Sequence, residues 1–133
     1  MQAFVKGNPD SRLTPAALTY LARFAFDRKE WDQAEAAYKK ALAHPRLEPV
    51  QRAIVLLGLG KVREAQGKPG EAQAFFDQIA DKHFDDLKAY ANGTADLAAG
   101  KAESARKQFQ AAATGQPPSA LTGWAKDALD YLP

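Results

Sequence analysis

One short pattern occurs three times in this chain of 133 residues, and it limits the folds that the chain can adopt. In each copy a small alanine follows a turn, an aromatic residue stands four positions after the alanine, and Ala or Ile stands three positions later. Self-similarity at a spacing of roughly 20–50 residues is the signature of stacked supersecondary units. The three copies are Ala34/Tyr38/Ala41, Ala72/Phe76/Ile79 and Ala105/Phe109/Ala112.

A second recurring set of residues precedes each copy of this pattern. Its members begin at the same distance before the small alanine of each copy and follow the spacing i, i+3, i+4, i+7, which is typical of a buried helical stripe. Each repeat is therefore predicted to be an antiparallel pair of helices. The third set is the least apolar, so its helix is expected to pack less firmly. The sets are Leu18/Leu21/Ala22/Ala25, Leu56/Leu59/Gly60/Arg63 and Ala89/Asn92/Gly93/Asp96.

Capping residues, prolines and glycines predict where the helices begin and end. Thr14, which precedes Pro15, and Asp85 are expected to act as N-terminal caps, while Gly100 and Gly115 are expected to end helices. The expected helices cover about residues 15–28, 31–44, 48–66, 69–82, 85–100, 101–115 and 119–132.

The two outer segments leave alternatives open. Residues 1–7 are too short for a helix of their own, but Phe4 stands one repeat length before Tyr38. Either the chain is a fragment of a longer protein and Phe4 ends a preceding helix, or the segment is a frayed terminus. The last helix is expected to cap the stack; a partner-binding helix and a lipid-surface helix are the alternatives. Its apolar stripe is Leu121, Trp124, Ala125, Ala128, Leu129 and Leu132, opposite Lys126, Asp127 and Asp130.

Composition excludes several classes of function. The net charge is only +2, from 18 basic and 16 acidic residues spread along the chain, which argues against nucleic acid as a partner. The chain has no cysteine and therefore neither disulfides nor Cys-ligated zinc. The longest apolar run, residues 53–60, is far shorter than the ~20 residues of a membrane span, so no membrane insertion is expected.

The sequence also lacks residues that would support catalysis. His44 and His83 are too isolated to form an ordinary metal site, and they are expected at a helix end and in a loop. The stretch 58–61 lacks the spacing of a phosphate-binding loop. We therefore expect no enzyme activity, no metal and no cofactor.

These residues resemble the tetratricopeptide repeat pattern, W-x2-L-G-x2-Y followed by A-x3-F and a late proline, over about residues 14–118. The match is best in the second copy, Leu56-x2-Leu59-Gly60 with Ala72-x3-Phe76. The resemblance implies an all-α, right-handed α-solenoid that forms one domain over 1–133. Its repeats would cover about residues 14–47, 48–84 and 85–118, with a capping helix at 119–132.

A narrower resemblance concerns residues 4–42, with Pro9-Asp10-Ser11 and Trp31-Asp32-Gln33-Ala34. They are similar to the repeats of bacterial envelope proteins: the cell-division coordinator of the Tol-Pal system, the tetratricopeptide lipoprotein of outer-membrane assembly, and the ancillary subunit of the Sec translocon. This similarity favours the bacterial periplasm or cell envelope, and the cytoplasm is the alternative.

In the superfamily the first helices of the pairs line a concave groove. Arg23 and Lys61 would suit an extended peptide with an acidic or C-terminal carboxylate group. The carboxylate clamp for chaperone tails is not reproduced, because Thr19/Arg23 and Leu87/Ala91 stand at its positions. The residues that resemble groove-lining positions, all expected to be unnecessary for the core, are Thr19, Arg23, Phe26, Leu57, Lys61, Glu64, Tyr90, Thr94 and Leu97.

Three functions remain open. The favoured one is a non-catalytic scaffold that binds an extended peptide or a helix of another protein in this groove. The second is self-association into an oligomer through apolar surface at the N-terminal edge or on the last helix. The third is a docking segment of a larger enzyme.

Overall fold

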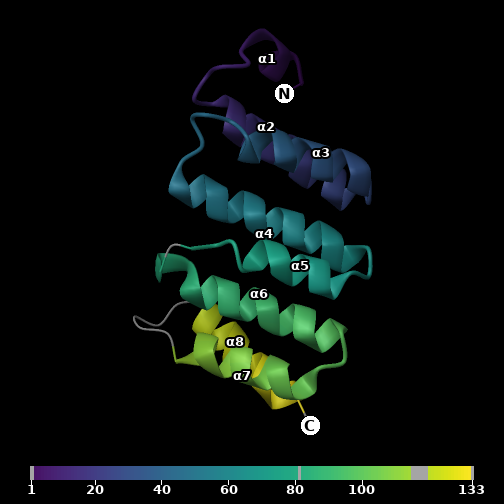
Figure 1. Cartoon of the computed structure of the whole chain (residues 1–133), viewed down its shortest axis with the longest axis vertical. Coiled ribbons are helices and arrows are strands. Elements are labelled where there is room, and N and C mark those ends of the chain that lie inside the picture. The colour runs from purple at the N-terminus through teal and green to yellow at the C-terminus, as the bar shows by residue number, and fades with distance from the viewer. Residues whose placement is uncertain (1, 81, 115–119, 133) are drawn as a thin grey trace.

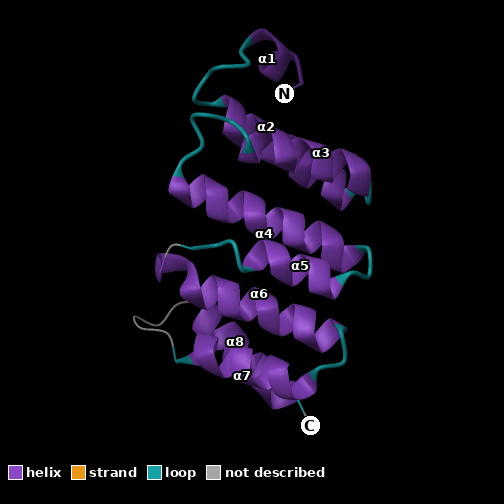
Figure 2. Cartoon of the chain, viewed as in Figure 1, coloured by secondary structure: helices purple, strands orange, loops and turns teal. Residues whose placement is uncertain are grey.

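The protein is a single stack of helix pairs in the computed structural model, which describes residues 2–80, 82–114 and 120–132. Successive helices run back and forth, and the pairs follow one another along the long axis from α1 to α8 (Figure 1). The described residues contain no strand (Figure 2). The all-α solenoid expected from the sequence is thus confirmed. Its elements are α1 Gln2–Gly7, α2 Thr14–Asp27, α3 Trp31–Leu42, α4 Pro49–Ala65, α5 Pro69–Phe76, the 3-10 turn η1 Lys82–Phe84, α6 Asp85–Ala98, α7 Ala102–Ala113 and α8 Ala120–Tyr131.

The recurring alanines and aromatics form the contacts inside the stack. All three small alanines are fully buried, and the three aromatics are at most 5% exposed. In the second and third pairs the aromatic ring lies against a glycine of the first helix. A Cβ atom at Gly60 would lie 2.1 Å from the ring of Phe76, and one at Gly93 would lie 2.6 Å from the ring of Phe109. Any larger residue at these glycines would push the paired helices apart.

The three turns between paired helices have the same geometry. Lys29, Gly67 and Gly100 have φ angles of 61°, 77° and 77°, in the left-handed region. At Gly67 the backbone N–H of Lys68 donates to Arg63 and that of Gly67 donates to Glu64, which is a Schellman C-cap. The first and third turns have the same pair of hydrogen bonds. Lys29 therefore adopts a backbone conformation that glycine adopts with less steric strain.

Polar residues replace part of the apolar core at α6. Asn92 and Asp96 are buried, as their place in the stripe predicted. The Asp96 carboxylate accepts hydrogen bonds from Gln73 of α5 (2.5 Å) and Ser104 of α7 (2.6 Å), and the Asn92 amide donates to Asp77 (3.1 Å). Side-chain hydrogen bonds thus join α6 to both neighbours where large apolar residues are missing.

A charged pair joins α3 to α4. Arg63, which stands in the buried stripe of α4, donates to the Glu35 carboxylate and also to Gln66 (3.0 Å). Lys39 lies 2.8 Å from the same carboxylate. The hydrogen bond with Lys39 is the main cause that lowers the pKa of Glu35, and the charge of Arg63 adds to it against the opposing effect of burial.

Two expected caps were wrong. The Thr14 hydroxyl donates to the Asn8 carbonyl, so it ties the preceding loop to α2, and Leu13 takes the N-cap position without a side-chain hydrogen bond. Asp85 is the first residue of α6 and caps nothing, although its charge suits the positive end of the helix dipole. Its predecessor Phe84 is at the N-cap and packs beside Ile79.

Two expected boundaries were also wrong. Residues 2–7 do form a helix, because Val5 packs against the core of the first pair and Phe4 accepts hydrogen bonds from Asn8. The helix expected over 69–82 ends at Phe76. There the chain tightens into a turn that places Ile79, 2% exposed, in a cluster with α4 residues. Burial of Ile79 in this cluster is therefore more favourable than continuation of the helix.

The last helix, α8, packs on α7 and α6. Ala125 is fully buried, while Ala128, Leu129 and Leu132 are half-buried. Trp124 departs from the expected buried stripe, since it is 55% exposed. The side chain of Leu121, as well as Gly115 and the expected helix start at 117–119, lies outside the described residues. The outward face is polar, with Lys126, Asp127 and Asp130 exposed.

We predict that Lys29→Gly raises the free energy of unfolding by about 1 kcal/mol, because glycine removes the cost of a side chain in the left-handed region. The converse change Gly67→Lys should lower it by a similar amount. Urea unfolding followed by circular dichroism measures both. A decrease for Lys29→Gly would contradict the assigned turn.

We predict that Glu35→Gln lowers the free energy of unfolding at pH 7 by about 1–2 kcal/mol, because Arg63 and Lys39 lose their charged partner. Since the folded-state pKa of Glu35 is lowered, its contribution is present above pH 4.5 and is lost as the pH falls through the lowered value. The variant and the wild type should therefore converge in stability toward pH 3. The exposed Glu103→Gln on α7, away from Arg63, serves as the control, and a difference that persists in acid would rule out the ionic origin.

Candidate protein-binding groove

The first helices of the pairs form one wall of the stack. Helices α2, α4, α6 and α8 each contact the next member of this series, while each second helix contacts mainly the first helices beside it. The stack is therefore more tightly wound along the α2–α4–α6–α8 side, which makes that side the inner one. The residues predicted to line a groove stand on these first helices.

Two adjoining cavities, of about 360 and 260 Å³, lie between α2 and α4. They share Arg23, Tyr38 and Ile54, and we call them together the α2–α4 groove. The first is lined by Ala16, Thr19, Tyr20, Arg23, Tyr38, Gln51 and Ile54, and the second by Arg23, Phe26, Tyr38, Ile54, Leu57, Gly58 and Lys61.

Five of the nine predicted groove residues line these cavities: Thr19, Arg23, Phe26, Leu57 and Lys61. The Thr19 hydroxyl already donates to the Pro15 carbonyl at 2.8 Å. The expectation that none of these residues serves the core was wrong for two of them. Phe26 packs edge-on against Trp31, with ring centroids 5.2 Å apart, and Leu57 packs against the cluster that joins α5 to α6.

The other four predicted residues lie further along the wall and line neither cavity. Glu64 accepts a hydrogen bond from the Thr94 hydroxyl (3.4 Å) and so joins α4 to α6. The ring of Tyr90 packs against Phe109 and Trp124, and Leu97 is 48% exposed. This second group is separated from the cavities.

Sequence reasoning missed two apolar residues of the groove. Tyr20 is 66% exposed and Ile54 is 46% exposed, and both line the first cavity. Ile54 lies about one helical turn before Leu57 and two turns before Lys61, so extension of the predicted stripe by one turn would have found it. The same extension on α2 gives Ala16, which also lines the cavity.

With the site described, the chain can be compared with known proteins. The sequence model of the tetratricopeptide repeat-like domain matches residues 1–131. The chain belongs to the tetratricopeptide repeat-like family. No curated protein and no solved structure matches this tetratricopeptide repeat-like chain significantly. Membership indicates a protein-interaction scaffold in general, of a kind that is typically non-catalytic.

Tyr38 occupies a central place in the groove of this tetratricopeptide repeat-like domain. Its ring extends from α3 to α4, where a Cβ atom at Gly58 would lie 2.3 Å from the ring and 2.7 Å from the hydroxyl. No hydrogen bond to that hydroxyl occurs within the described residues. Burial raises the pKa of Tyr38, against the opposing charge of Arg23, so the phenol stays protonated at neutral pH.

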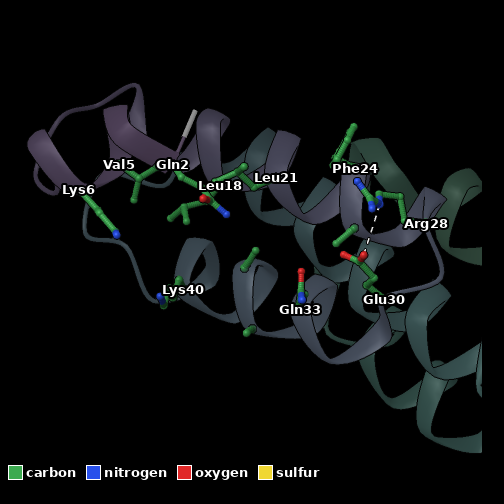
Figure 3. A pocket seen from close by; sticks show the side chains of 13 residues that line it. Gln2, Val5, Lys6, Leu18, Leu21, Phe24, Arg28, Glu30, Gln33 and Lys40 are labelled. Atoms are coloured by element: carbon green, nitrogen blue, oxygen red, sulfur yellow. Dashed lines mark ion pairs between the residues drawn. The ribbon is translucent and has the colours of Figure 1, made fainter.

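A further cavity, of about 640 Å³, lies elsewhere, between α1, α2 and α3 (Figure 3). Leu18 and Leu21 line it, with Lys6 and Lys40 at one end and the Arg28–Glu30 ion pair (3.3 Å) at the other. We call it the N-terminal edge cavity. Its remaining lining residues are Gln2, Val5, Phe24, Ala25, Gln33, Ala36 and Ala37.

The histidines serve the loops of the domain. His44 Nδ1 accepts a hydrogen bond from the Arg46 backbone N–H (3.1 Å), so Nε2 carries the proton and donates to the Pro9 carbonyl (2.9 Å). The ring thus ties two loops together near the end of α3. His83 is exposed in η1. The described residues contain no cluster of three metal-binding side chains and no helix long and apolar enough to cross a membrane.

We predict that Tyr38→Phe changes the free energy of unfolding at pH 7 by less than about 0.5 kcal/mol, because the lost hydroxyl has no partner. Because burial raises the folded-state pKa, the wild type should lose stability as the pH rises above about 10. Tyr38→Phe should reduce that loss, and the exposed Tyr20→Phe should not. Urea unfolding at pH 7 and pH 11 measures the free energy of unfolding of each protein. A large loss of stability in Tyr38→Phe at pH 7 would show that the hydroxyl has a hydrogen-bond partner.

Proposed function

We propose that this chain is a non-catalytic interaction domain that binds an extended peptide or a helix of a partner protein in the α2–α4 groove. The observation that carries the proposal is the pair of adjoining cavities, which together offer room for successive side chains of one bound segment. The five predicted residues that line them support the assignment.

Exposed apolar surface in the groove favours a protein partner. Tyr20 and Ile54 would lose most of their contact with water in a complex, and large aromatic and branched side chains supply much of the energy of such interfaces. The charged residues favour an acidic partner. Among the described residues, Arg23 pairs with Asp27 at 3.5 Å and Lys61 with Glu64 at 3.9 Å, each on its own helix, and exposed pairs of this kind are weak enough to exchange for a ligand.

The N-terminal edge cavity favours self-association as the second candidate. It holds apolar surface from α1, α2 and α3, and Phe24 at its edge is 62% exposed. The polar outer face of α8 argues against stacking through that end. Sedimentation equilibrium across a range of concentrations tests this candidate, and a monomer at the highest concentration would eliminate it.

The cellular compartment is proposed from the sequence of residues 4–42 alone. Their similarity to bacterial envelope repeats favours the periplasm or cell envelope, with the cytoplasm as the alternative. The family match does not distinguish between these compartments. Fractionation of cells that carry the native gene distinguishes the two.

The groove is tested by locating a partner on it. A photo-crosslinking amino acid at position 54 should trap a protein partner that mass spectrometry can identify, whereas the same group at position 107 on α7 should not. With that partner purified, Arg23→Glu combined with Lys61→Glu should weaken binding about tenfold or more, since two attractive charges become repulsive. Helicity and melting should be unchanged.

The matched control is Lys107→Glu combined with Lys126→Glu, which makes the same change in net charge on exposed residues of α7 and α8. This double variant should bind the partner like the wild type. Equal weakening by both pairs would indicate a nonspecific effect of net charge and would count against the groove.

A further inference from the structure

The hydroxyl of Tyr38 is an accessible polar group at the end of a buried ring. Tyr38 is 5% exposed as a whole residue and lines both cavities of the α2–α4 groove. Its hydroxyl is not among the buried unpartnered atoms, and the described residues supply it with no hydrogen bond. A phenol with a buried ring and an accessible hydroxyl can donate a hydrogen bond to a bound group.

A difference between the repeats explains why this ring reaches the groove. In the second and third pairs the ring lies against Gly60 or Gly93 of its own pair. The first pair has Ala22 at that position, and Ala22 belongs to the same buried cluster as Tyr38. The ring of Tyr38 instead lies against Gly58 on the first helix of the next pair, so its hydroxyl comes between α2 and α4.

Two cations line the groove together with this hydroxyl. Arg23 lines both cavities, and its charge acts on the Tyr38 phenol, as does the opposite charge of Asp27, which pairs with Arg23 at 3.5 Å. Lys61 lines the second cavity, and its side chain is 37% exposed. A neutral donor that shares a groove with a guanidinium and an ammonium is complementary to a carboxylate.

The geometry points to a subsite in which the Tyr38 hydroxyl, Arg23 and Lys61 receive the carboxylate of an Asp or Glu side chain within the partner's segment. The inference rests on the proposed function of the groove. The Tyr38 hydroxyl donates to one carboxylate oxygen and Arg23 donates to the carboxylate from the rim. Tyr38 is then a specificity-determining residue, although its repeat position suggested packing alone.

The arrangement of the cavities favours an internal acidic residue over a chain terminus. Arg23, Tyr38 and Ile54 are the residues that the two cavities share, so the carboxylate would lie between them. Cavity space continues on both sides, toward Gln51 and toward Leu57, and a segment that fills both must pass through the middle. The expected ligand pattern is an apolar residue on each side of Asp or Glu.

The test uses three peptides of equal length and the ¹⁵N-labelled protein in NMR titrations. Acetyl-Leu-Ala-Glu-Ala-Leu-amide presents an internal carboxylate, the same peptide with Gln in place of Glu presents none, and the Gln peptide with a free C-terminus presents only a terminal one. The Glu peptide should shift the resonances of Ile54 and Gly58 and should bind about tenfold more tightly than the Gln amide, with a dissociation constant on the order of 1 mM.

Tyr38→Phe is the matched variant, because it removes only the hydroxyl. It should reduce the preference for Glu over Gln from about tenfold to about twofold, since the exposed cations remain and contribute little alone. It should leave the amide spectrum outside the groove unchanged.

Each of the four following outcomes would contradict the proposed carboxylate subsite. Equal binding of the Glu and Gln amides at the groove would retain the groove and eliminate the carboxylate subsite. Tightest binding by the free C-terminus would replace the internal acidic residue with a chain end. An unchanged preference in Tyr38→Phe would remove the role of the hydroxyl. Absence of shifts on α2 and α4 up to about 20 mM would also reject the subsite, while crosslinking at position 54 tests the groove independently.

Discussion

Close approach of an aromatic ring to a residue without a side chain is the contact on which this stack depends. Phe76 against Gly60 and Phe109 against Gly93 leave no room for a Cβ atom, and the alanines opposite are fully buried. Because the rings fill the space between paired helices, the pairs are held by packing that tolerates little change in volume. Pairs built in this way can then stack on one another, which gives the molecule its length (Figure 1).

The third pair meets the same constraint by different chemistry. Asn92 and Asp96 occupy places that are apolar in the first pair. Gln73 and Ser104 donate to the Asp96 carboxylate, and the Asn92 amide donates to Asp77, although the Asn92 side-chain oxygen has no partner among the described residues. A buried carboxylate without those donors would be strongly destabilising. The polar residues on α6 therefore depend on their hydrogen-bond donors on α5 and α7. These hydrogen bonds hold α6 between its two neighbours.

The groove follows from a small departure in the first pair. The first pair has Ala22 in place of glycine, and the ring of Tyr38 lies against Gly58 of the next pair. The space between α2 and α4 is lined by exposed apolar residues and two cations. The aromatic residue that serves only packing in the second and third pairs is thus a tyrosine in the first pair, where it lines the candidate groove. The proposed subsite depends on that tyrosine.

The sequence alone determined the helix pairs, their order and the buried stripes, because these depend on periodicity and on turn positions such as Lys29, Gly67 and Gly100. It also placed Thr19, Arg23, Phe26, Leu57 and Lys61 on one wall. Only the tertiary structure decided that α5 ends at Phe76, that Thr14 binds the Asn8 carbonyl, that Tyr90 packs on Trp124, and that Tyr38 reaches the groove. Each of these depends on a contact between residues distant in sequence or on a neighbouring side chain's volume, and neither quantity is contained in local spacing.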